Sequence, residues 1–508
     1  MKTLTKQLLE TEGSQSAEYV ELDHLPEKVL QFGKGNFLRA FVDWQIHQLN
    51  KQHLFNGKVV IYQPSPHGQS KVFLEDQDFL YTVVLRGIEN GKKVDTSEVI
   101  SSVSRSLSYD QWSHALKLAS SEELELIISN TTEAGITYVA ETPPNQEDIP
   151  KSFPAKLTMF LFERYQRLGE RKAPGLTILP CELIEQNGTK LKEYTMKYAR
   201  DWQLPVSFIE WIENKNTFCN TLVDRIVTGY PHDSIEEYHE RLGYEDKGLT
   251  VGEPYHLFVI DGGEDVQRTL PLSAAQLNVK WGDITPYREI KVRLLNGPHT
   301  MMFSVGHLFG LRTVQEVMET ESTRQFVEAA FHEIKQVVSG DEQEKEAFIA
   351  SVKERFLNPY NHHHLLDIGL NAINKFKARL LPTLKRFVEE KGELPQSIVF
   401  SMASLFLYYK PIRREDDGLV GLRDGVEYKM KENEDVLSLV TQAWKFYDKG
   451  GELATVVSSL LQADHVWGED VSRLPGLHEA VTNYLQLMLE EGMSSGLERL
   501  LNDCEITG

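Results

Sequence analysis

Residues 28–40 read KVLQFGKGNFLRA and combine a short apolar run, a glycine turn and the beginning of a helical segment. Gly33 and Gly35 allow a tight turn and a close approach of the backbone to a pyrophosphate at a helix N-terminus. Leu38 stands where the common GxGxxG pattern has its third glycine, so a plain strand-to-helix turn is the alternative. The position favours a dinucleotide-binding turn, because it joins the first strand to the first helix of an alternating region.

The rest of the first half alternates short β-type runs with stretches of helical spacing. Four runs predict strands, at residues 28–32, 58–63, 124–129 and 176–179. Two stretches between them predict helices, at residues 97–119 and 154–168. This alternation indicates an α/β Rossmann-type N-terminal domain with a mainly parallel, doubly wound sheet, which we place at residues 1–284.

The texture of the sequence changes near Pro286, where helical periodicity takes over and strand-like alternation becomes scarce. We predict helices at residues 288–295, 300–308, 322–338, 342–356, 364–387, 394–409, 434–447 and 475–501. The second domain is therefore expected to be a mostly α-helical substrate and catalytic domain at residues 285–508.

The composition and the net charge limit the classes of partner that the chain is expected to bind. The chain has 508 residues, of which 41% are hydrophobic and 25% charged, a balance typical of globular proteins. The formal net charge of −21 disfavours nucleic acid and anionic membranes as partners. Three cysteines without a CxxC pair, and an N-terminus without the apolar core of a signal peptide, predict a soluble cytoplasmic protein. The most apolar stretch, 397–409, is too short to span a bilayer.

A polar loop, SNTTEAG at 129–135, directly follows the third predicted strand. Because loops at the carboxyl ends of parallel strands line the ligand crevice, we expect Asn130 and Thr131 to contact a cofactor. A capped turn is the alternative. The end of the second strand, Tyr62-Gln63-Pro64, has neither an acid for a free ribose nor an arginine for a 2′-phosphate, so NAD is favoured only modestly over NADP.

A third signal is KVRLLNGPH at 291–299. On a straight α-helix, Asn296 and His299 would lie about 140° and 80° from Lys291, a loose common side, although Pro298 can kink or break such a helix. A lysine with a lowered pKa can exchange a proton with a carbinol oxygen, while asparagine and histidine donate hydrogen bonds to that oxygen. This chemistry needs no metal. A surface lysine followed by a capping asparagine is the alternative.

Several motifs in the same order resemble the polyol-specific long-chain dehydrogenases, the mannitol dehydrogenase family. They are Gly33–Phe37, Asn130–Gly135, Val223–Ile226, Lys291–His299, Asn358–Tyr360 and Lys375 before Leu380-Leu381-Pro382. The resemblance implies a Rossmann-type domain followed by a helical domain, NAD as cofactor and metal-free hydride transfer. It makes Lys291 the catalytic acid/base and lets Asn296 and His299 polarise the reacting oxygen. It assigns the cofactor to Val29, Leu30, Gln31, Phe32, Gly33, Lys34, Gly35, Asn36, Phe37, Leu38, Arg39 and Ala40.

Finer features are similar to one branch of this family, which reduces tagaturonate, a keto acid derived from a hexuronate, to the aldonate altronate. They are the stretches 29–40, 40–45, 129–136, 180–184 and 222–231. Leu183, Arg288 and Asp367 depart from the mannitol-active pattern, so a sugar acid fits better than a neutral hexitol. We expect three residues to bind this substrate: Lys375 by its match to the family, Asp224 within the VDRI motif, and Arg379. The cationic cluster Lys375, Lys377 and Arg379 suits a carboxylate, with a solvated helix face as the alternative.

Other interpretations stay open. Oxidation of mannonate or of mannitol would belong to other branches of the same family, and a non-catalytic nucleotide or sugar-acid sensor would belong to another class. The retention of Lys291, Asn296 and His299 argues against a sensor. The run His362–His364 is more typical of a polar helix start than of a metal site, because adjacent helical residues point apart. Residues 413–418 predict a solvated, mixed-charge loop. The sequence leaves the oligomeric state open.

Overall fold

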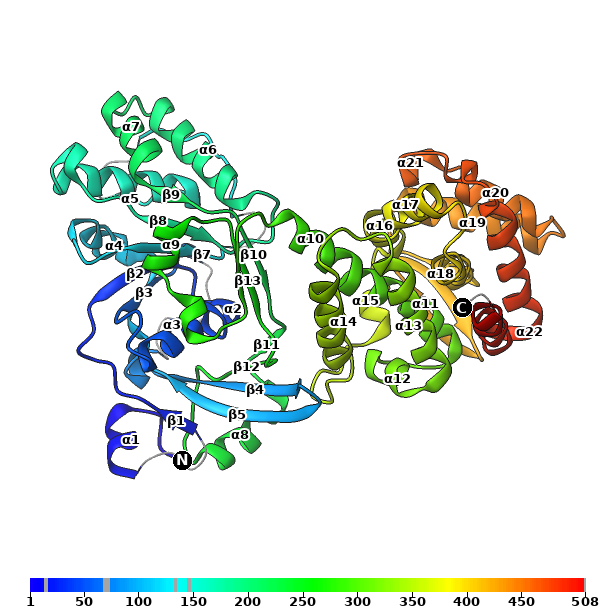
Figure 1. The fold of residues 1–508 in the computed structure, drawn as a ribbon, viewed down its shortest axis with the longest axis horizontal. Coiled ribbons are helices and arrows are strands. Elements are labelled where there is room, and N and C mark those ends of the chain that lie inside the picture. The colour runs from blue at the N-terminus through cyan, green and yellow to red at the C-terminus, as the bar shows by residue number, and fades with distance from the viewer. Residues whose placement is uncertain (13–16, 67–73, 132–134, 144–147, 507–508) are drawn as a thin grey trace. The chain divides into compact units, whose positions relative to one another are not determined.

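The computed structural model describes residues 1–12, 17–66, 74–131, 135–143 and 148–506. The chain forms two compact units, Met1–Ile284 and Thr285–Gly508 (Figure 1). Within the described part of the chain, no helix is both long enough and apolar enough to cross a membrane.

The first unit is built on a parallel sheet of six strands in the order β6-β3-β2-β7-β8-β9. The strands are β2 (Glu27–Phe32), β3 (Lys58–Tyr62), β6 (Val103–Leu107), β7 (Leu126–Ser129), β8 (Thr177–Pro180) and β9 (Thr217–Phe218). This is the strand order of a doubly wound Rossmann sheet, so the predicted fold class is confirmed for this unit. The strand order reverses between β2 and β7, where the crevice of such folds lies.

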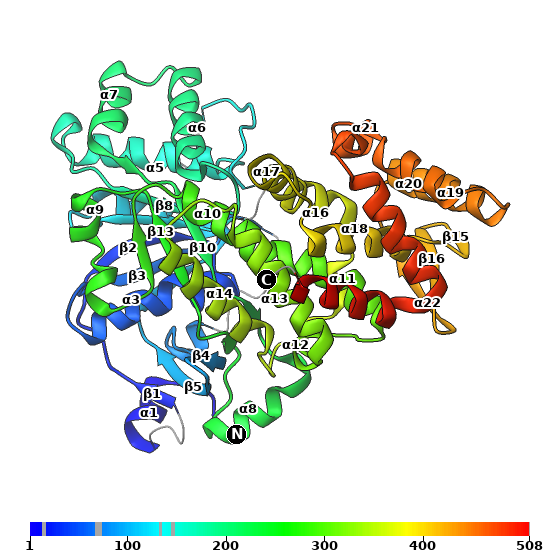
Figure 2. The ribbon, with the colours of Figure 1, turned by 45° about the vertical axis from the view of Figure 1, so that its right-hand side comes forward.

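Helices cover both faces of this sheet because successive apolar residues of each strand point to opposite sides. Val59 and Ile61 belong to one core, whereas Val60 and Tyr62 belong to the other. The first core contains α3 (Val42–Lys51). The second core contains α4 (Trp112–Lys117), α5 (Phe153–Arg167), α6 (Asn187–Asp201) and α7 (Val206–Lys215), the last three grouped on one side of the strands in Figure 2.

The predicted helix at 97–119 is wrong over its first half. The chain there forms the end of β5 (Lys92–Ile100) and then β6, and the helical part is confined to α4 and the short 3₁₀ turns Tyr109–Gln111 and Leu118–Ser120 that flank it. Val99, Val103 and Leu107 are spaced by four and therefore fit a helical period, but each lies on a strand. Strand β5 pairs with β4 (Tyr81–Glu89), so a β-hairpin stands between β3 and β6 where a helix was expected.

Two further sheets complete the first unit. The β4–β5 hairpin lies in a mixed sheet, β1-β5-β4-β12-β11, with β1 (Ala17–Tyr19), β11 (Val227–Gly229) and β12 (Thr250–Gly252). A small sheet contains β10 (Thr221–Asp224), β13 (Leu257–Ile260) and β14 (Val279–Trp281). The remaining helices are α1 (Lys6–Glu12), α2 (Asn36–Arg39), α8 (Ile235–Leu242) and α9 (Glu264–Thr269).

The second unit is mostly helical, as predicted, and α18 (Gln396–Tyr408) runs through its middle (Figures 1 and 2). Helix α18 is apolar on nearly all sides because α11 (Gly297–Phe309), α13 (Glu321–Lys335) and α22 (Leu477–Ile506) pack against it. The other helices are α10 (Thr285–Lys291), α12 (Val314–Glu319), α14 (Glu342–Phe356), α15 (Leu365–Ile368), α16 (Ala372–Arg379), α17 (Leu381–Lys391), α19 (Glu434–Asp448), α20 (Leu453–Leu461) and α21 (Asp464–Trp467).

Two predictions for this unit need correction. The single helix expected at 364–387 is divided into α15, α16 and α17, because Asn371 adopts a left-handed backbone with φ 52° and Pro382 permits a new helix start. The loop expected at 413–418 contributes to an antiparallel sheet of β15 (Arg413–Glu415), β16 (Gly418–Arg423) and β17 (Val426–Met430). Only the turn between β15 and β16 is a loop.

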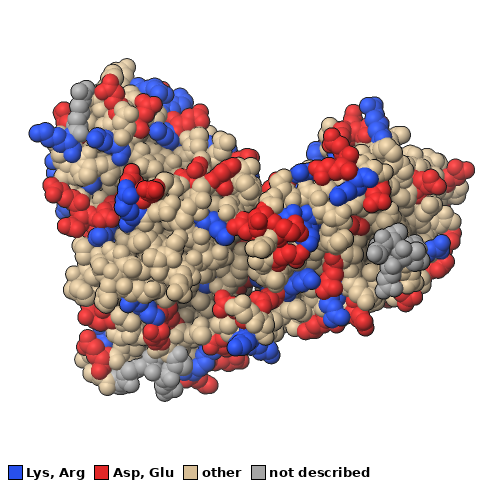
Figure 3. Space-filling view, in the orientation of Figure 1, with Lys and Arg blue, Asp and Glu red and all other residues tan. Residues whose placement is uncertain are grey.

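On the face seen in Figure 3, acidic and basic side chains are interspersed over each unit, so the acidic excess forms no single field on that face. Because the net charge of the chain is −21, attraction for an anionic ligand must come from local cationic groups.

Candidate active site

The residues Lys291, Asn296 and His299 lie on one continuous helical segment that contains a π-turn. Helix α10 ends at Lys291, residues Val292–Asn296 form the π-turn, and α11 begins at Gly297. The N–H of Gly297 donates to the carbonyl of Val292, five residues earlier. Pro298 lacks an N–H, and its ring would collide with the carbonyl four residues back in a regular α-helix. The wider turn directly before it accommodates this proline without ending the helix.

The π-turn changes the relative directions of the three side chains. A π-turn absorbs one extra residue, so everything after it is rotated back by about 100° relative to an uninterrupted α-helix. Asn296 then lies about 40° from Lys291 and His299 about 20° from it on the other side. The three residues therefore share one narrow face, closer together than a straight helix would place them.

His299 lies in a partly buried, positively charged environment. Its ring centroid is 4.4 Å from that of Phe356 and 5.1 Å from that of His363. Burial lowers the pKa of His299 well below its usual value of 6.5, and nearby groups lower it further: His363, Arg355, Arg379 and Lys375. The imidazole is therefore neutral at pH 7 and retains one N–H donor.

Helix α16 supplies two of these cations, Lys375 and Arg379, one helical turn apart. The ammonium of Lys375 donates to the carbonyl of Ile368 at 2.9 Å. Burial and the charge of Arg379 lower the pKa of Lys375, while Glu432 opposes this shift. Burial also lowers the pKa of Arg379. Both sequence-predicted residues therefore lie in the surroundings of His299.

Thr300 connects Arg379 to the π-turn. Its hydroxyl donates to the carbonyl of Asn296 at 2.9 Å and accepts a bond from Nη1 of Arg379 at 3.1 Å. From the other side, Nη1 of Arg293 donates to the backbone carbonyl of Arg379 at 2.6 Å. The end of α16 is thus held against the π-turn at two points. Within the described residues, no hydrogen bond engages the side-chain amide of Asn296 or the imidazole of His299, so both are available to a ligand.

In the first unit, the glycine turn follows β2 at the strand-order reversal. Gly33 has φ +117°, and a Cβ there would lie 2.8 Å from the carbonyl oxygen of Asn130, so only glycine fits. A Cβ on Gly35 would meet no atom within 4 Å. Gly33 thus allows β2 and β7 to approach each other, whereas Gly35 borders open space beside the start of α2.

The carbonyls of this turn are held by two flanking side chains and by one from elsewhere in the unit. Nε2 of Gln31 donates to the carbonyl of Gly33 at 3.0 Å, and Nε of Arg39 to that of Lys34 at 3.3 Å. The buried guanidinium of Arg225 donates to the carbonyl of Ala40 at 2.6 Å, and also to two carbonyls of the β12–β13 connection. The backbone geometry of the turn is therefore fixed before any ligand binds.

Most of the predicted cofactor residues are buried and shape the turn from within: Val29, Leu30, Gln31, Phe32, Gly33, Leu38, Arg39 and Ala40. Lys34 and Phe37 are partly exposed, and Gly35 and Asn36 are exposed. These four are the members that a cofactor can reach with side-chain or surface contacts.

A small cavity opens at the carboxyl ends of β2, β3 and β6. It is lined by Lys34, Gln63, Ser65, Pro66, Ser106, Leu107, Ser108 and Tyr109. This is where the adenosine half of a dinucleotide lies in doubly wound folds. None of these described lining residues is an acid, which agrees with the composition of Tyr62-Gln63-Pro64.

The loop after β7 bonds to the end of β8. Glu182, 3% exposed, accepts hydrogen bonds from the hydroxyls of Ser129 and Thr131 at 3.0 and 2.9 Å. Nδ2 of Asn130 donates to the carbonyl of Cys181 at 2.9 Å. Burial raises the pKa of Glu182. Asn130 and Thr131 therefore border the crevice, and no helix begins in the described residues 135–143 for them to cap. Residues Thr132, Glu133 and Ala134 lie outside the described part of the chain.

Asp224 belongs to the first unit, where it is buried on β10 opposite Leu257. Its role toward a substrate stays a prediction. Sequence reasoning missed Thr300 and Arg355, which no motif marks, and Glu182, which was hidden in the 180–184 stretch. It set His363 aside with its two neighbours, although the three-histidine run was visible. His364 does precede α15, but His363 turns toward His299.

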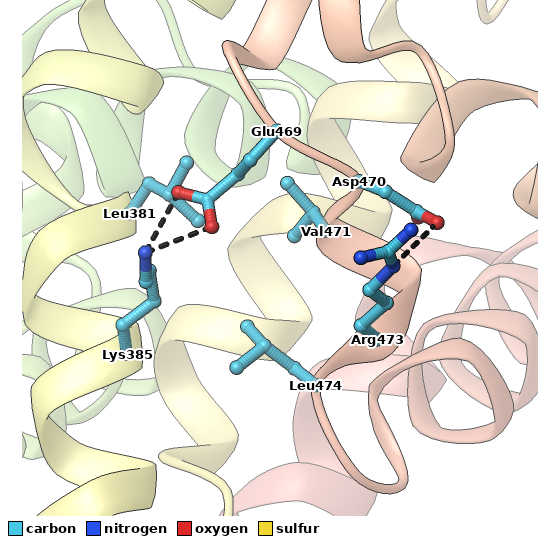
Figure 4. Close-up of a pocket in the computed structure, with 7 residues that line it drawn as sticks. All are labelled: Leu381, Lys385, Glu469, Asp470, Val471, Arg473 and Leu474. Atoms are coloured by element: carbon cyan, nitrogen blue, oxygen red, sulfur yellow. Dashed lines mark hydrogen bonds and ion pairs between the residues drawn. The ribbon is translucent and has the colours of Figure 1, made fainter.

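A cavity in the second unit is lined by charged side chains that already form ion pairs with one another. It is lined by Leu381, Lys385, Glu469, Asp470, Val471, Arg473 and Leu474 (Figure 4). Nζ of Lys385 lies 2.8 Å from Glu469, and Nε of Arg473 lies 3.2 Å from Asp470. It offers no uncompensated charge to a ligand. Within the described residues, no three His, Cys, Asp or Glu side chains are arranged to hold a metal ion.

Comparisons with known proteins agree on one relationship. Residues 27–274 match the mannitol dehydrogenase Rossmann domain, and residues 283–489 match the mannitol dehydrogenase C-terminal domain. The altronate oxidoreductase of Halalkalibacterium halodurans is 46% identical over 481 residues, 94% of each chain. That of Bacillus subtilis is 43% identical over 486 residues, 95% of this chain and 96% of the relative.

Solved structures show the same fold. A substrate-free D-sorbitol dehydrogenase matches with a TM-score of 0.79 at 22% identity, covering 98% of this chain and all of the other. The mannitol 2-dehydrogenase of Pseudomonas fluorescens, solved with NAD and D-mannitol, matches with a TM-score of 0.65 at 20% identity, covering 99% of this chain and all of the other. The resemblance in the motifs is confirmed: this chain belongs to the mannitol dehydrogenase family.

Proposed function

We propose that this chain is an NAD-dependent altronate oxidoreductase. It reduces tagaturonate to altronate with NADH and, in the reverse direction, oxidises altronate to tagaturonate with NAD. The observation that carries the proposal is the near full-length identity to two bacterial relatives of that name. The site geometry supports it, because a proton donor, two hydrogen-bond donors and a cationic environment suit a ketone on an anionic sugar acid. The ligand is therefore a small molecule.

The first unit has the features that NAD requires. Gly35 leaves room beside the start of α2, as close approach of a pyrophosphate demands. Gln63, Ser65 and Ser106 line the cavity with groups that suit ribose hydroxyls. Asn130 and Thr131 border the neighbouring part of the crevice. When bound, NADH supplies the hydride that the ketone carbon accepts.

The second unit supplies the proton and stabilises the charge. We assign the proton to the ammonium of Lys291, which donates it to the oxygen of the ketone as that oxygen becomes an alkoxide. The amide of Asn296 and the neutral imidazole of His299 donate hydrogen bonds to the same oxygen. Both are free of hydrogen bonds within the described residues, and the π-turn directs them to the face of Lys291. In the reverse direction, the neutral amine of Lys291 accepts the proton.

A substrate panel tests the proposal. The purified protein is assayed for NADH oxidation at neutral pH against tagaturonate, fructuronate and fructose. We expect the highest kcat/KM for tagaturonate. A preference for fructuronate would assign the chain to mannonate oxidation, and a preference for fructose to the mannitol branch. A protein that oxidises NADH with none of the three would contradict the proposal.

A further inference from the structure

A sugar acid brings a carboxylate into a protein of net charge −21, so its binding needs a local positive group. The surroundings of His299 provide three permanent cations, Arg355, Lys375 and Arg379. They differ in what they already bind. The cation with unused hydrogen-bond donors and no acid beside it is the best candidate for the carboxylate.

Lys375 is already engaged. Its ammonium donates to the carbonyl of Ile368 at 2.9 Å, and the carboxylate of Glu432 is close enough to act on its charge. Glu432 itself is fixed by Asn374 at 3.1 Å and by the hydroxyl of Tyr409 at 3.0 Å. Lys375 therefore has one donor committed to a carbonyl and an acid that partly compensates its charge, which favours contact with a hydroxyl over a carboxylate.

Arg379 is different. Its guanidinium carries five N–H donors, and its side chain makes one hydrogen bond, to the hydroxyl of Thr300. Among the described residues, no carboxylate pairs with it. A partly buried guanidinium with several unused donors matches the two oxygens of a carboxylate, and this planar match is specific to arginine.

We propose that Arg379 binds the carboxylate of the substrate, that Thr300 is the positioning residue that holds it, and that Lys375 contacts a hydroxyl instead. This inference rests on the proposed function, because it assumes a sugar acid. The hydroxyl of Thr300, 2% exposed, accepts from Arg379 and donates to the carbonyl of Asn296. The carboxylate end of the substrate is thereby fixed relative to the residue that meets its ketone oxygen. A neutral ketose lacks the group that Arg379 recognises.

The test compares an acid with its neutral counterpart. kcat/KM is measured for tagaturonate and for tagatose in the wild type, Arg379→Met, Arg379→Lys and Lys375→Met. We expect Arg379→Met to lower kcat/KM for tagaturonate by about ten- to a hundredfold, mainly through KM, and to change that for tagatose less than about threefold. Arg379→Lys should recover only part of the loss, because an ammonium lacks the planar fork. Lys375→Met should reduce both substrates alike.

The positioning role of Thr300 is tested by a separate pair of variants. Thr300→Val keeps the shape and removes both hydrogen bonds, whereas Thr300→Ser keeps the hydroxyl. We expect Thr300→Val to raise KM for tagaturonate and Thr300→Ser to restore it. Thr300→Val combined with Arg379→Met should lose little more than Arg379→Met alone, because the two act as one unit. Additive losses would show that Thr300 does not work through Arg379.

Lys377→Met is the matched control, since it removes a cation of the same helix whose ammonium donates to the carbonyl of Val466 at 2.9 Å. It should leave kcat/KM unchanged for both substrates.

A second measurement needs no turnover and therefore also works if a variant is inactive. Altronate and the neutral alditol altritol are titrated into the enzyme–NADH complex, and binding is followed by NADH fluorescence. Arg379→Met should weaken the binding of altronate and leave that of altritol unchanged.

Two outcomes separate the proposals. If the wild type reduces none of the sugar acids, the proposed function fails, and the altronate titration still decides the role of Arg379. If the wild type reduces tagaturonate but Arg379→Met harms acid and neutral ligands equally, or Lys375→Met shows the acid-selective loss, the assignment of Arg379 is overturned while the function stands.

Discussion

The imidazole rings of His299 and His363 meet edge to face, with centroids 5.1 Å apart and planes inclined at 77°. Burial lowers the pKa of each ring, and His363 further lowers that of His299. The other charged groups facing His299 are Arg355, Arg379 and Lys375, all cations. Burial and these cations therefore disfavour protonation of His299, which leaves a neutral imidazole with one N–H donor.

This relationship predicts the acid limb of the pH profile. Because the pKa of His299 is lowered, kcat/KM for keto-acid reduction should stay level as pH falls through 6.5 and decline only below it. His363→Asn removes one of the repelling groups, so the pKa of His299 rises and the decline should begin at higher pH. A wild-type decline centred at 6.5, unchanged by His363→Asn, would contradict this view.

Lys291→Ala tests the proton donor. The variant should lose about 10²–10⁴-fold in kcat, the range of general acid–base catalysis, because no ammonium remains to protonate the alkoxide. NADH affinity, measured by fluorescence titration, should be unchanged because the cofactor site lies in the first unit. Near wild-type turnover would place the proton on another group. Treatment of the wild type with a chelator serves as the control and should have no effect.

The two glycines of the cofactor turn should respond differently. Gly35→Val places a side chain in open space, so it should preserve the thermal unfolding temperature while weakening NADH binding at least about tenfold. Gly33→Ala forces a Cβ against the carbonyl of Asn130 at positive φ and should cost about 1–3 kcal/mol of stability. Thermal unfolding and NADH titration of both variants are the measurements. Unchanged NADH affinity in folded Gly35→Val would remove this turn from the cofactor site.

Asp43 gives a stability prediction. It is buried beneath the cofactor turn, and burial raises its pKa to about 7 from 3.8. Between about pH 4 and pH 7 the folded state holds a proton that the unfolded chain has released, so this group lowers stability as pH rises through that window. The free energy of unfolding of Asp43→Asn, measured relative to the wild type by urea unfolding, should therefore be higher at pH 8 than at pH 5. An equal difference at both pH values would contradict the shifted pKa.

The sequence correctly predicted those strands, turns and helices that are determined by short-range patterns. The strand and turn at residues 28–40 followed from an apolar run and two glycines, and the parallel sheet from the alternation of elements. Residues 97–119 failed because Val99, Val103 and Leu107 fit two periods, and only pairing with β3 and β4 selects the strand. Helical spacing alone could not show where Asn371 ends one helix and begins another.

The candidate site likewise contains residues that a sequence motif predicts and residues that only the folded structure reveals. Lys291, Asn296 and His299 were predicted from one motif, but their common face depends on a π-turn that a helical wheel does not contain. Thr300 and Arg355 carried no signal, because their importance comes from tertiary contact with α16 and with His299. A threonine next to His299 becomes noticeable only when Arg379 is seen to donate to its hydroxyl.

The hydrogen bonds from Arg225 to Ala40 and from Arg39 to Gly248 join residues 185 and 209 positions apart. In chain order, the cofactor turn is made early, yet Arg225, which holds the carbonyl of Ala40, and Gly248, whose carbonyl accepts from Arg39, arrive only after most of the first unit has been synthesised. A nascent chain that ends before Arg225 therefore has the glycines and the local bonds of Gln31 and Arg39, but not the long-range bonds. We expect the turn to become fully rigid only when this long chain segment closes.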